Sequence, residues 1–173
     1  SSESFELQLA LGNLYLRKGE VDKAIKLHQS LISQPNLPEN YRTKALLAMG
    51  KDYMSAGLLD RAEVLFTELV EIEAYTPEAL HSLCEVYQQE QDWEEAIKSA
   101  TRYTAVSGRN MNNDIAHFNC ELAEKCFQKN EDVKAELYLK AALKINPKCV
   151  RAKLIQAREL QKAEKWKPAI EAY

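Results

Sequence analysis

The sequence predicts an all-α protein, a right-handed α-solenoid of antiparallel helix pairs, and three observations support this. A small set of residues recurs at a constant interval along the 173-residue chain. Only 5 Gly and 5 Pro are present, about half of ordinary usage, which leaves few positions for the tight turns of a strand-rich sandwich or barrel. The apolar residues make up 46% of the chain, enough to bury a core, so a disordered chain is not expected.

A pair of small residues with constant spacing marks each copy of the repeat. In the first copy the pair is Gly12 and Ala24, and the period of the pattern is that of the tetratricopeptide repeat, about 34 residues. Small residues recur because two helices cross closely there. The other pairs are Gly50 and Ala62, Cys84 and Ala96, Ala123 and Ala135, and Ala157 and Ala169. We expect one array with repeats at 5–38, 43–76, 77–110, 116–149 and 150–173, the last of them truncated.

Glycines and a proline-rich segment separate the helices of the first two repeats. Gly19 and Gly57 punctuate the turns between paired helices. Residues 34–38 contain two prolines and form a longer connection. Asp60 stands where a second helix begins. The expected helices are 5–18, 21–33, 40–56 and 60–73.

Capping residues and prolines mark the helix starts of the later repeats. Thr76-Pro77 and Asn146-Pro147 each place a capping side chain before a proline of the first turn. Asp92 and Asp132 stand where second helices begin, and Asp92 with Glu95 forms a capping box. The expected helices are 77–90, 93–106, 114–129, 132–144, 148–163 and 167 onward, with Pro168 in the first turn of the last and a longer connection at 107–113.

The charges exclude two classes of partner. The chain has 23 Lys and Arg against 26 Asp and Glu, a net charge of −3 without a block of like charges. Such a surface does not attract nucleic acid or anionic lipid broadly. The longest apolar run, 45–49, is far shorter than the roughly 20 residues of a membrane helix. We expect a soluble fragment of a longer protein.

No residue pattern in the chain predicts catalysis, a cofactor or a metal. Cys84, Cys120, Cys126 and Cys149 lack paired C-x-x-C spacing and are expected to be buried free thiols. His28 occupies the usual aromatic packing position of its repeat. No nucleophile or general base stands out. The alternative of an enzyme with a cryptic site would require a compact pocket of strongly coupled ionisable groups.

Function is expected instead in the groove that the first helices of the repeats line. Resemblance to the tetratricopeptide family implies that these candidates face the groove, with packing inside the repeat stack as the alternative for each: Asn13, Leu16, Arg17, Lys51, Met54, His81, Glu85, Gln88, His117, Cys120, Glu124, Phe127, Arg151 and Arg158. Leu16, Met54 and Phe127 would offer apolar contacts to a partner peptide.

The clamp that holds chaperone C-terminal carboxylates in some of these repeat domains is not expected. Its places hold Leu9, Asn13, Ala48, Glu78 and Ser82. Only Asn13 fits that clamp, and Glu78 would repel a carboxylate.

Three segments also resemble one particular family. Residues 11–29 (LGNLYLRKGEVDKAIKLHQ), 50–63 (GKDYMSAGLLDRAE) and 115–123 (IAHFNCELA) are similar to lipopolysaccharide assembly protein B of Gram-negative bacteria. The resemblance implies repeats at the cytoplasmic face of the inner membrane, an N-terminal membrane anchor and a C-terminal rubredoxin-like module with iron or zinc. We expect the anchor and the four-cysteine module to lie outside this segment, so its own cysteines are not expected to bind metal.

The same resemblance implies a non-enzymatic adaptor. Its partners would be a membrane-bound AAA+ protease and the deacetylase that commits material to lipid A. The adaptor would promote degradation of this deacetylase by the protease. The alternative is a generic repeat scaffold for another complex, with a homodimer formed through exposed solenoid ends.

Overall fold

The computed structural model describes the backbone of residues 2–171 and the side chains of residues 2–165, and in this range every regular element is helical. The all-α prediction is confirmed. None of the described helices is long and apolar enough to cross a membrane. The elements are α1 (Ser2–Arg17), α2 (Val21–Ile32), α3 (Glu39–Ser55), α4 (Leu59–Val70), the short 3₁₀ helix η1 (Glu73–Tyr75), α5 (Thr76–Glu90), α6 (Trp93–Ser107), α7 (Asn112–Gln128), α8 (Asp132–Ile145) and α9 (Val150–Glu171).

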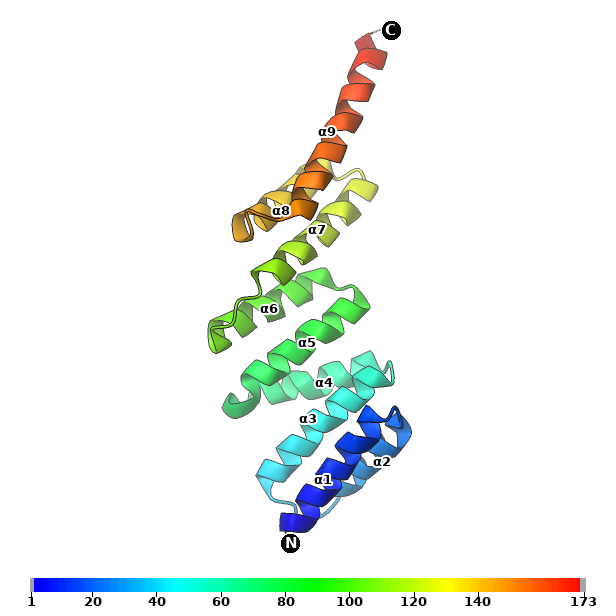
Figure 1. The fold of residues 1–173 in the computed structure, drawn as a ribbon, viewed down its shortest axis with the longest axis vertical. Helices are drawn as coiled ribbons and strands as arrows, with labels where there is room; N and C mark the ends of the chain where they lie inside the picture. The colour runs from blue at the N-terminus through cyan, green and yellow to red at the C-terminus, as the bar shows by residue number, and fades with distance from the viewer. Residues whose placement is uncertain (1, 172–173) are drawn as a thin grey trace. The chain divides into compact units, whose positions relative to one another are not determined.

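The chain divides into two compact units, and Figure 1 labels the helices that belong to them. Unit 1 ends at Glu90 and contains α1 to α5, and unit 2 begins at Gln91 and contains α6 to α9. Within unit 1 each helix packs against the next, and α3 also contacts the two other first helices, α1 and α5. Within unit 2, α7 packs against α6, α8 and α9. A single array of five repeats stays a prediction.

Unit 1 shows why a small residue begins each repeat pattern. A Cβ atom on Gly12 would overlap the imidazole ring of His28, and one on Gly50 would lie 2.5 Å from Cε1 of Phe66. Both rings belong to the second helix of the same repeat and are fully buried. The aromatic ring therefore lies directly on the backbone of the paired helix, which only glycine permits at this distance.

A left-handed residue closes the first helix in four of the repeats. At Gly19, the N–H donates to the carbonyl three residues back (3.0 Å), and the Glu20 N–H donates to the carbonyl five residues back (2.9 Å). These two bonds define a Schellman motif, and they recur at Gly57 and Asn130. Gln91 and Asn130 adopt φ of 58° and 60° at the same register. The predicted glycine turns are confirmed.

One of the expected side-chain caps is present. Asp92 precedes α6, and its Oδ1 accepts a hydrogen bond from the Glu95 N–H (3.3 Å). Asp60 and Asp132 instead lie in the first turns of α4 and α8, where a negative charge complements the helix dipole without a hydrogen bond to the cap.

The two Pro-containing starts differ from the prediction. Thr76 does not cap α5, because η1 directly precedes it and its backbone is already helical; its Oγ1 instead donates to the Val70 carbonyl (2.6 Å). At the other site, Asn146 accepts a hydrogen bond from the Lys148 N–H (3.1 Å) through its side chain. This closes a turn that contains Pro147, so α9 begins at Val150.

The predicted break between 163 and 167 is wrong, because α9 is one continuous helix through Glu171 that contains Pro168. In the first four repeats a left-handed residue stands at this register, whereas here the place holds Glu164 inside the helix. Its neighbours are Gln161, Lys162, Ala163 and Lys165, all good helix formers, and none favours a turn. Residues 172–173 of the predicted last helix lie outside the described residues.

Candidate interaction groove

A hollow of about 500 Å³ opens in unit 1 between the first helices of its repeats, and we call it the basic hollow. Four predicted groove residues line it, namely Asn13, Leu16, Arg17 and Lys51. The other lining residues are Leu9, Lys44, Leu47, Ala48, Tyr75 and Glu78. Its volume lies within the roughly 300–1,000 Å³ range of ligand pockets.

Helical spacing explains how these residues reach one hollow. On α1, Leu9, Asn13 and Leu16 follow each other at intervals of four and three, which places them on one face. On α3, Lys44, Ala48 and Lys51 repeat that spacing. Because α1 contacts α3 and α3 contacts α5, these faces border a common depression. The η1 turn adds Tyr75 to the rim, a contribution that the repeat pattern does not predict.

The hollow combines an apolar floor with a basic rim. Leu47 and Ala48 are buried, while Arg17, Lys44 and Lys51 are exposed. The lining contains one carboxylate, that of Glu78, and the Lys51 Nζ lies 2.7 Å from its Oε1. Both partners are about half exposed, so the pair contributes roughly 0–1 kcal/mol.

The two remaining cations of the rim are not neutralised. Within residues 2–165, neither Arg17 nor Lys44 has an acidic group within ion-pair distance. The Lys44 Nζ lies 5.7 Å from the centre of the Tyr41 ring. Tyr41 donates its hydroxyl hydrogen bond to Glu6 (2.8 Å), and this bond raises the tyrosine pKa.

In unit 2, predicted groove residues of α7 and α9 meet in a charged network. Arg151 lies 2.8 Å from Glu121 Oε1 and 2.8 Å from His117 Nδ1. The Glu124 carboxylate lies between Arg151 (3.6 Å) and Arg158 (3.5 Å). Burial opposes the charge of Arg151, but the Glu121 hydrogen bond and the nearby carboxylates outweigh it and raise the arginine pKa. The cations of this face are therefore already paired.

Glu121 is the member of this network that the repeat positions miss. It follows His117 by four residues on α7, and its Oε1 lies 3.6 Å from the His117 Nε2. The i,i+4 spacing was the sequence signal that could have identified it.

The expectation that Cys120 faces the groove is wrong. Its side chain is fully buried in a cluster formed by α7, α8 and α9, and its Sγ lies 3.9 Å from the Sγ of Cys149. Burial raises the pKa of the Cys120 thiol to about 12. The Cys120 thiol is part of the core because α7 packs closely against α8 and α9 at this position, which leaves no open groove there.

The other predicted groove residues belong neither to the basic hollow nor to the charged network around Arg151. Phe127 packs against the buried core of unit 2 and lines a second hollow, of about 420 Å³, with Leu160. On α5, His81 and Glu85 lie 3.7 Å apart and are about half exposed. Two further candidates are half-buried, namely Met54 and Gln88.

A buried contact between a histidine and an aspartate joins the first two repeats. The Nδ1 of His28 on α2 lies 2.5 Å from the Oδ2 of Asp52 on α3, and both side chains are fully buried. The packing role predicted for His28 is confirmed, whereas Asp52 was not predicted. Because solvent does not reach the pair, this histidine and carboxylate cannot meet a substrate.

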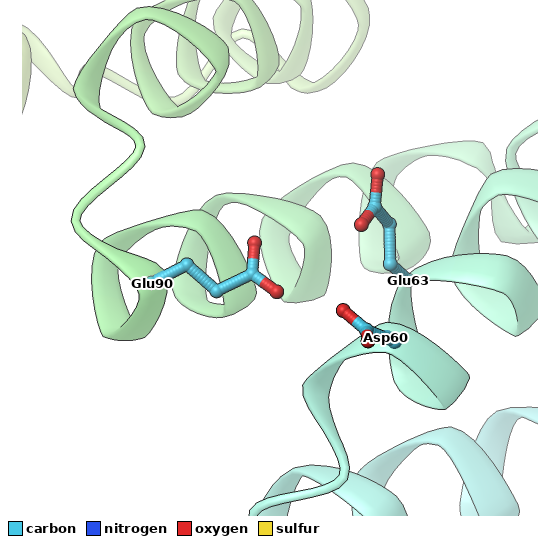
Figure 2. Close-up of side chains that lie close together, drawn as sticks. All are labelled: Asp60, Glu63 and Glu90. Atoms are coloured by element: carbon cyan, nitrogen blue, oxygen red, sulfur yellow. The ribbon is translucent and has the colours of Figure 1, made fainter.

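Three carboxylates of unit 1 lie close together. Figure 2 shows Asp60 and Glu63 of α4 and Glu90 of α5 pointing toward one another, with oxygens within 4.8 Å. The Glu63 Oε1 also accepts a hydrogen bond from the Tyr87 hydroxyl (2.9 Å). Carboxylate oxygens are ligands that hard cations prefer, but exposed acidic groups commonly cluster without one.

Comparison with known proteins shows which proteins the chain is similar to. A family model described as a tetratricopeptide repeat matches residues 7–40. Lipopolysaccharide assembly protein B of Escherichia coli strain K12 is 34% identical over 167 residues, which cover 96% of this chain and 43% of that protein. The protein of the same name from Haemophilus influenzae is 33% identical, over 91% of this chain and 39% of that protein. Among solved structures, a MamA protein has a TM-score of 0.57 at 24% identity, with 88% of this chain and 78% of that chain covered.

These relatives confirm the resemblance to the lipopolysaccharide assembly protein B family over nearly the whole chain. The chain spans less than half the length of those relatives. MamA supports the fold alone. The chain is thus a tetratricopeptide repeat scaffold, a class of helical array that binds other proteins.

Proposed function

We propose that this chain, a tetratricopeptide repeat relative of lipopolysaccharide assembly protein B, is a non-enzymatic adaptor that regulates lipopolysaccharide synthesis. It holds the deacetylase that commits material to lipid A and a membrane-bound AAA+ protease, and it thereby promotes degradation of the deacetylase. It acts at the cytoplasmic face of the bacterial inner membrane. The observation that carries this proposal is the 34% identity over 96% of the chain.

The groove surfaces of both units suit an adaptor. Unit 1 offers a basic hollow with an apolar floor, and unit 2 offers the charged face around Arg151. The His28–Asp52 pair, the most enzyme-like pair of groups described above, is closed to solvent. Binding through such surfaces requires no chemistry of the chain itself.

The test is capture of the purified deacetylase and the purified protease by the immobilised chain. Charge reversal at Lys51 and Glu85, on α3 and α5, changes two exposed side chains that were predicted to face the groove. Lys26→Glu is the matched control, because Lys26 is exposed on α2 and does not line the basic hollow. We expect Lys51→Glu or Glu85→Lys to reduce capture of at least one protein, and the control to retain it.

The outcomes separate the alternatives. Unchanged capture by every groove variant would reject the groove as the contact surface. Failure of the unaltered chain to capture either protein would reject the proposed adaptor function and favour a scaffold for another complex.

A further inference from the structure

We propose that the basic hollow of unit 1 binds an extended acidic segment of a partner protein, with an apolar side chain on the hollow floor and carboxylates at its rim. The inference rests on the proposed adaptor function and adds the chemistry of the partner. It follows from the lining of the hollow, the unpaired cations of its rim and the position of Glu78.

The floor of the hollow selects an apolar side chain. Leu9 and Leu16 of α1 are half-buried, and Leu47 and Ala48 of α3 are buried but reach the hollow surface. An apolar side chain placed there removes further apolar area from water, at roughly 25 cal/mol per Å². The Asn13 amide, also in the lining, offers both a donor and an acceptor to the backbone of an extended segment.

The rim selects negative charge. Three cations and one carboxylate line the hollow, although the chain as a whole carries a net charge of −3. Arg17 and Lys44 have no acidic partner in the described part of the chain, whereas both arginines of the unit 2 face are paired with carboxylates. The hollow is therefore a local positive site on an acidic protein, the condition under which charge complementarity steers a partner.

Glu78 opposes this binding in the free protein. Its carboxylate accepts a hydrogen bond from the Lys51 ammonium (2.7 Å) and adds a negative charge to the rim. An acidic segment must approach Glu78 or displace it from Lys51. Removing the charge of Glu78 should therefore strengthen binding, a gain of function that a purely apolar groove would not show.

The hollow lacks the arrangement needed to grip a chain terminus. Leu9 and Ala48 line the hollow at two places where a carboxylate clamp needs polar groups, so two of the groups that would hold a terminal carboxylate are missing. The carboxylates recognised are thus side chains within a segment, and a free C-terminus is not required.

The test measures binding of capped, fluorescein-labelled octapeptides to the full chain by fluorescence anisotropy. The acidic probe alternates Glu with Leu, a second peptide replaces Glu with Lys, and a third replaces Leu with Ser. We expect the chain to bind the acidic Glu/Leu probe, with about tenfold weaker binding for either replacement peptide. Binding should weaken as salt rises, because the rim cations are exposed.

Variants of the chain then locate the site. Arg17→Glu and Lys44→Glu should each weaken binding of the acidic probe about tenfold, Glu78→Gln should strengthen it severalfold, and Lys26→Glu should leave it within twofold. Circular dichroism of each variant confirms that the helices are retained. The Glu78→Gln gain cannot arise from misfolding, so it keeps the test decisive if a reversal unfolds the chain.

Four outcomes would overturn the inference. Equal binding of the acidic and the basic probes, or no change in Arg17→Glu and Lys44→Glu, removes the charge argument. Assembly of the chain into a dimer that these two reversals dissociate assigns the hollow to a second copy. Retained capture of both the deacetylase and the protease by a double variant, Arg17→Glu with Lys44→Glu, in the same capture assay rejects this inference while the adaptor function stands.

Discussion

Replacing His28 with Phe should destabilise the protein strongly, because it leaves the Asp52 carboxylate buried without a partner. Both side chains are fully buried, and the 2.5 Å contact between Nδ1 and Oδ2 is the polar contact that the described residues provide to this carboxylate. Its other oxygen, Oδ1, has no hydrogen-bond partner among them. Leaving a buried carboxylate without its partner costs about 3–5 kcal/mol, a large part of the 5–15 kcal/mol typical of a folded domain.

The lost hydrogen-bond partner of Asp52, and not the shape of the new ring, should cause this loss of stability. Phe66 occupies the corresponding place in the second repeat and lies on Gly50 as His28 lies on Gly12. A phenyl ring therefore fits this register. The next first helix also provides a model for the partner position, because Val86 stands where Asp52 stands in α3 and is fully buried.

The double variant His28→Phe with Asp52→Val should recover most of the stability. Asp52→Val alone leaves the His28 Nδ1 without its acceptor, at a cost of about 1–3 kcal/mol. Replacing both partners by packed apolar groups is often neutral or stabilising. The double variant should then lie within about 1 kcal/mol of the original protein, so the coupling between the two sites should amount to several kcal/mol.

Urea unfolding followed by far-ultraviolet circular dichroism measures this cycle, with thermal melting as a second readout. At 2–4 °C per kcal/mol for a chain of this size, His28→Phe should lower the Tm on the order of 10 °C. His81→Phe, the same change at an exposed histidine of α5, should change stability by no more than about 0.5 kcal/mol. A loss below about 1 kcal/mol for His28→Phe, or additive losses in the double variant, would refute the reasoning.

Three further predictions follow from single positions. Gly50→Ala places a methyl group against the Phe66 ring and should lower the free energy of unfolding by about 1–3 kcal/mol in urea titrations; unchanged stability would contradict the close helix contact. Gln91→Gly relieves a φ of 58° and should raise stability by up to about 1 kcal/mol, whereas Gln89→Gly, inside α5, should lower it; equal effects would contradict the assigned turn. The Cys120 thiol titrates near pH 12 when folded and near 8.5 when unfolded, so its contribution to stability is complete below about pH 8.5 and declines above it; in urea titrations from pH 8 to 11 the Cys120→Ala variant should lose less stability, and parallel curves would contradict the burial.

The repeat register was predictable because it rests on residue size, and the turns were predictable only where glycine marks them. Gly19 and Gly57 identify left-handed positions by their lack of a side chain. Gln91 and Asn130 adopt the same conformation at the same register. The residue type does not identify Gln91 as a left-handed turn position, since glutamine ordinarily favours a helix. The same register placed a turn at Glu164, where the helix continues.

Side-chain pairing between helices was less predictable than the backbone. The register placed Asn13, Arg17 and Lys51 on the groove side of unit 1, and they line the basic hollow. It also placed Cys120 there, although close packing of α7 against its neighbours buries this thiol. Asp52 was missed because a lone acidic residue on a helix is usually solvated, and its burial depends on a histidine 24 residues away.

The helix α3 contributes residues both to the buried His28–Asp52 pair and to the lining of the basic hollow. Lys51 and Asp52 are neighbours on α3, so their side chains point about 100° apart around its axis. The hydrogen bond from α2 to Asp52 fixes the rotation of α3 about that axis, because a slip would break a contact that is buried on both sides. The same rotation sets where Lys51 meets Glu78 and where Lys44, two turns earlier, faces the hollow. A hydrogen bond is directional in a way that the Phe66 ring contact is not. The pair at the first repeat junction, between α2 and α3, is therefore suited to hold α3 in the orientation that lines the hollow, even though neither of its side chains reaches the surface.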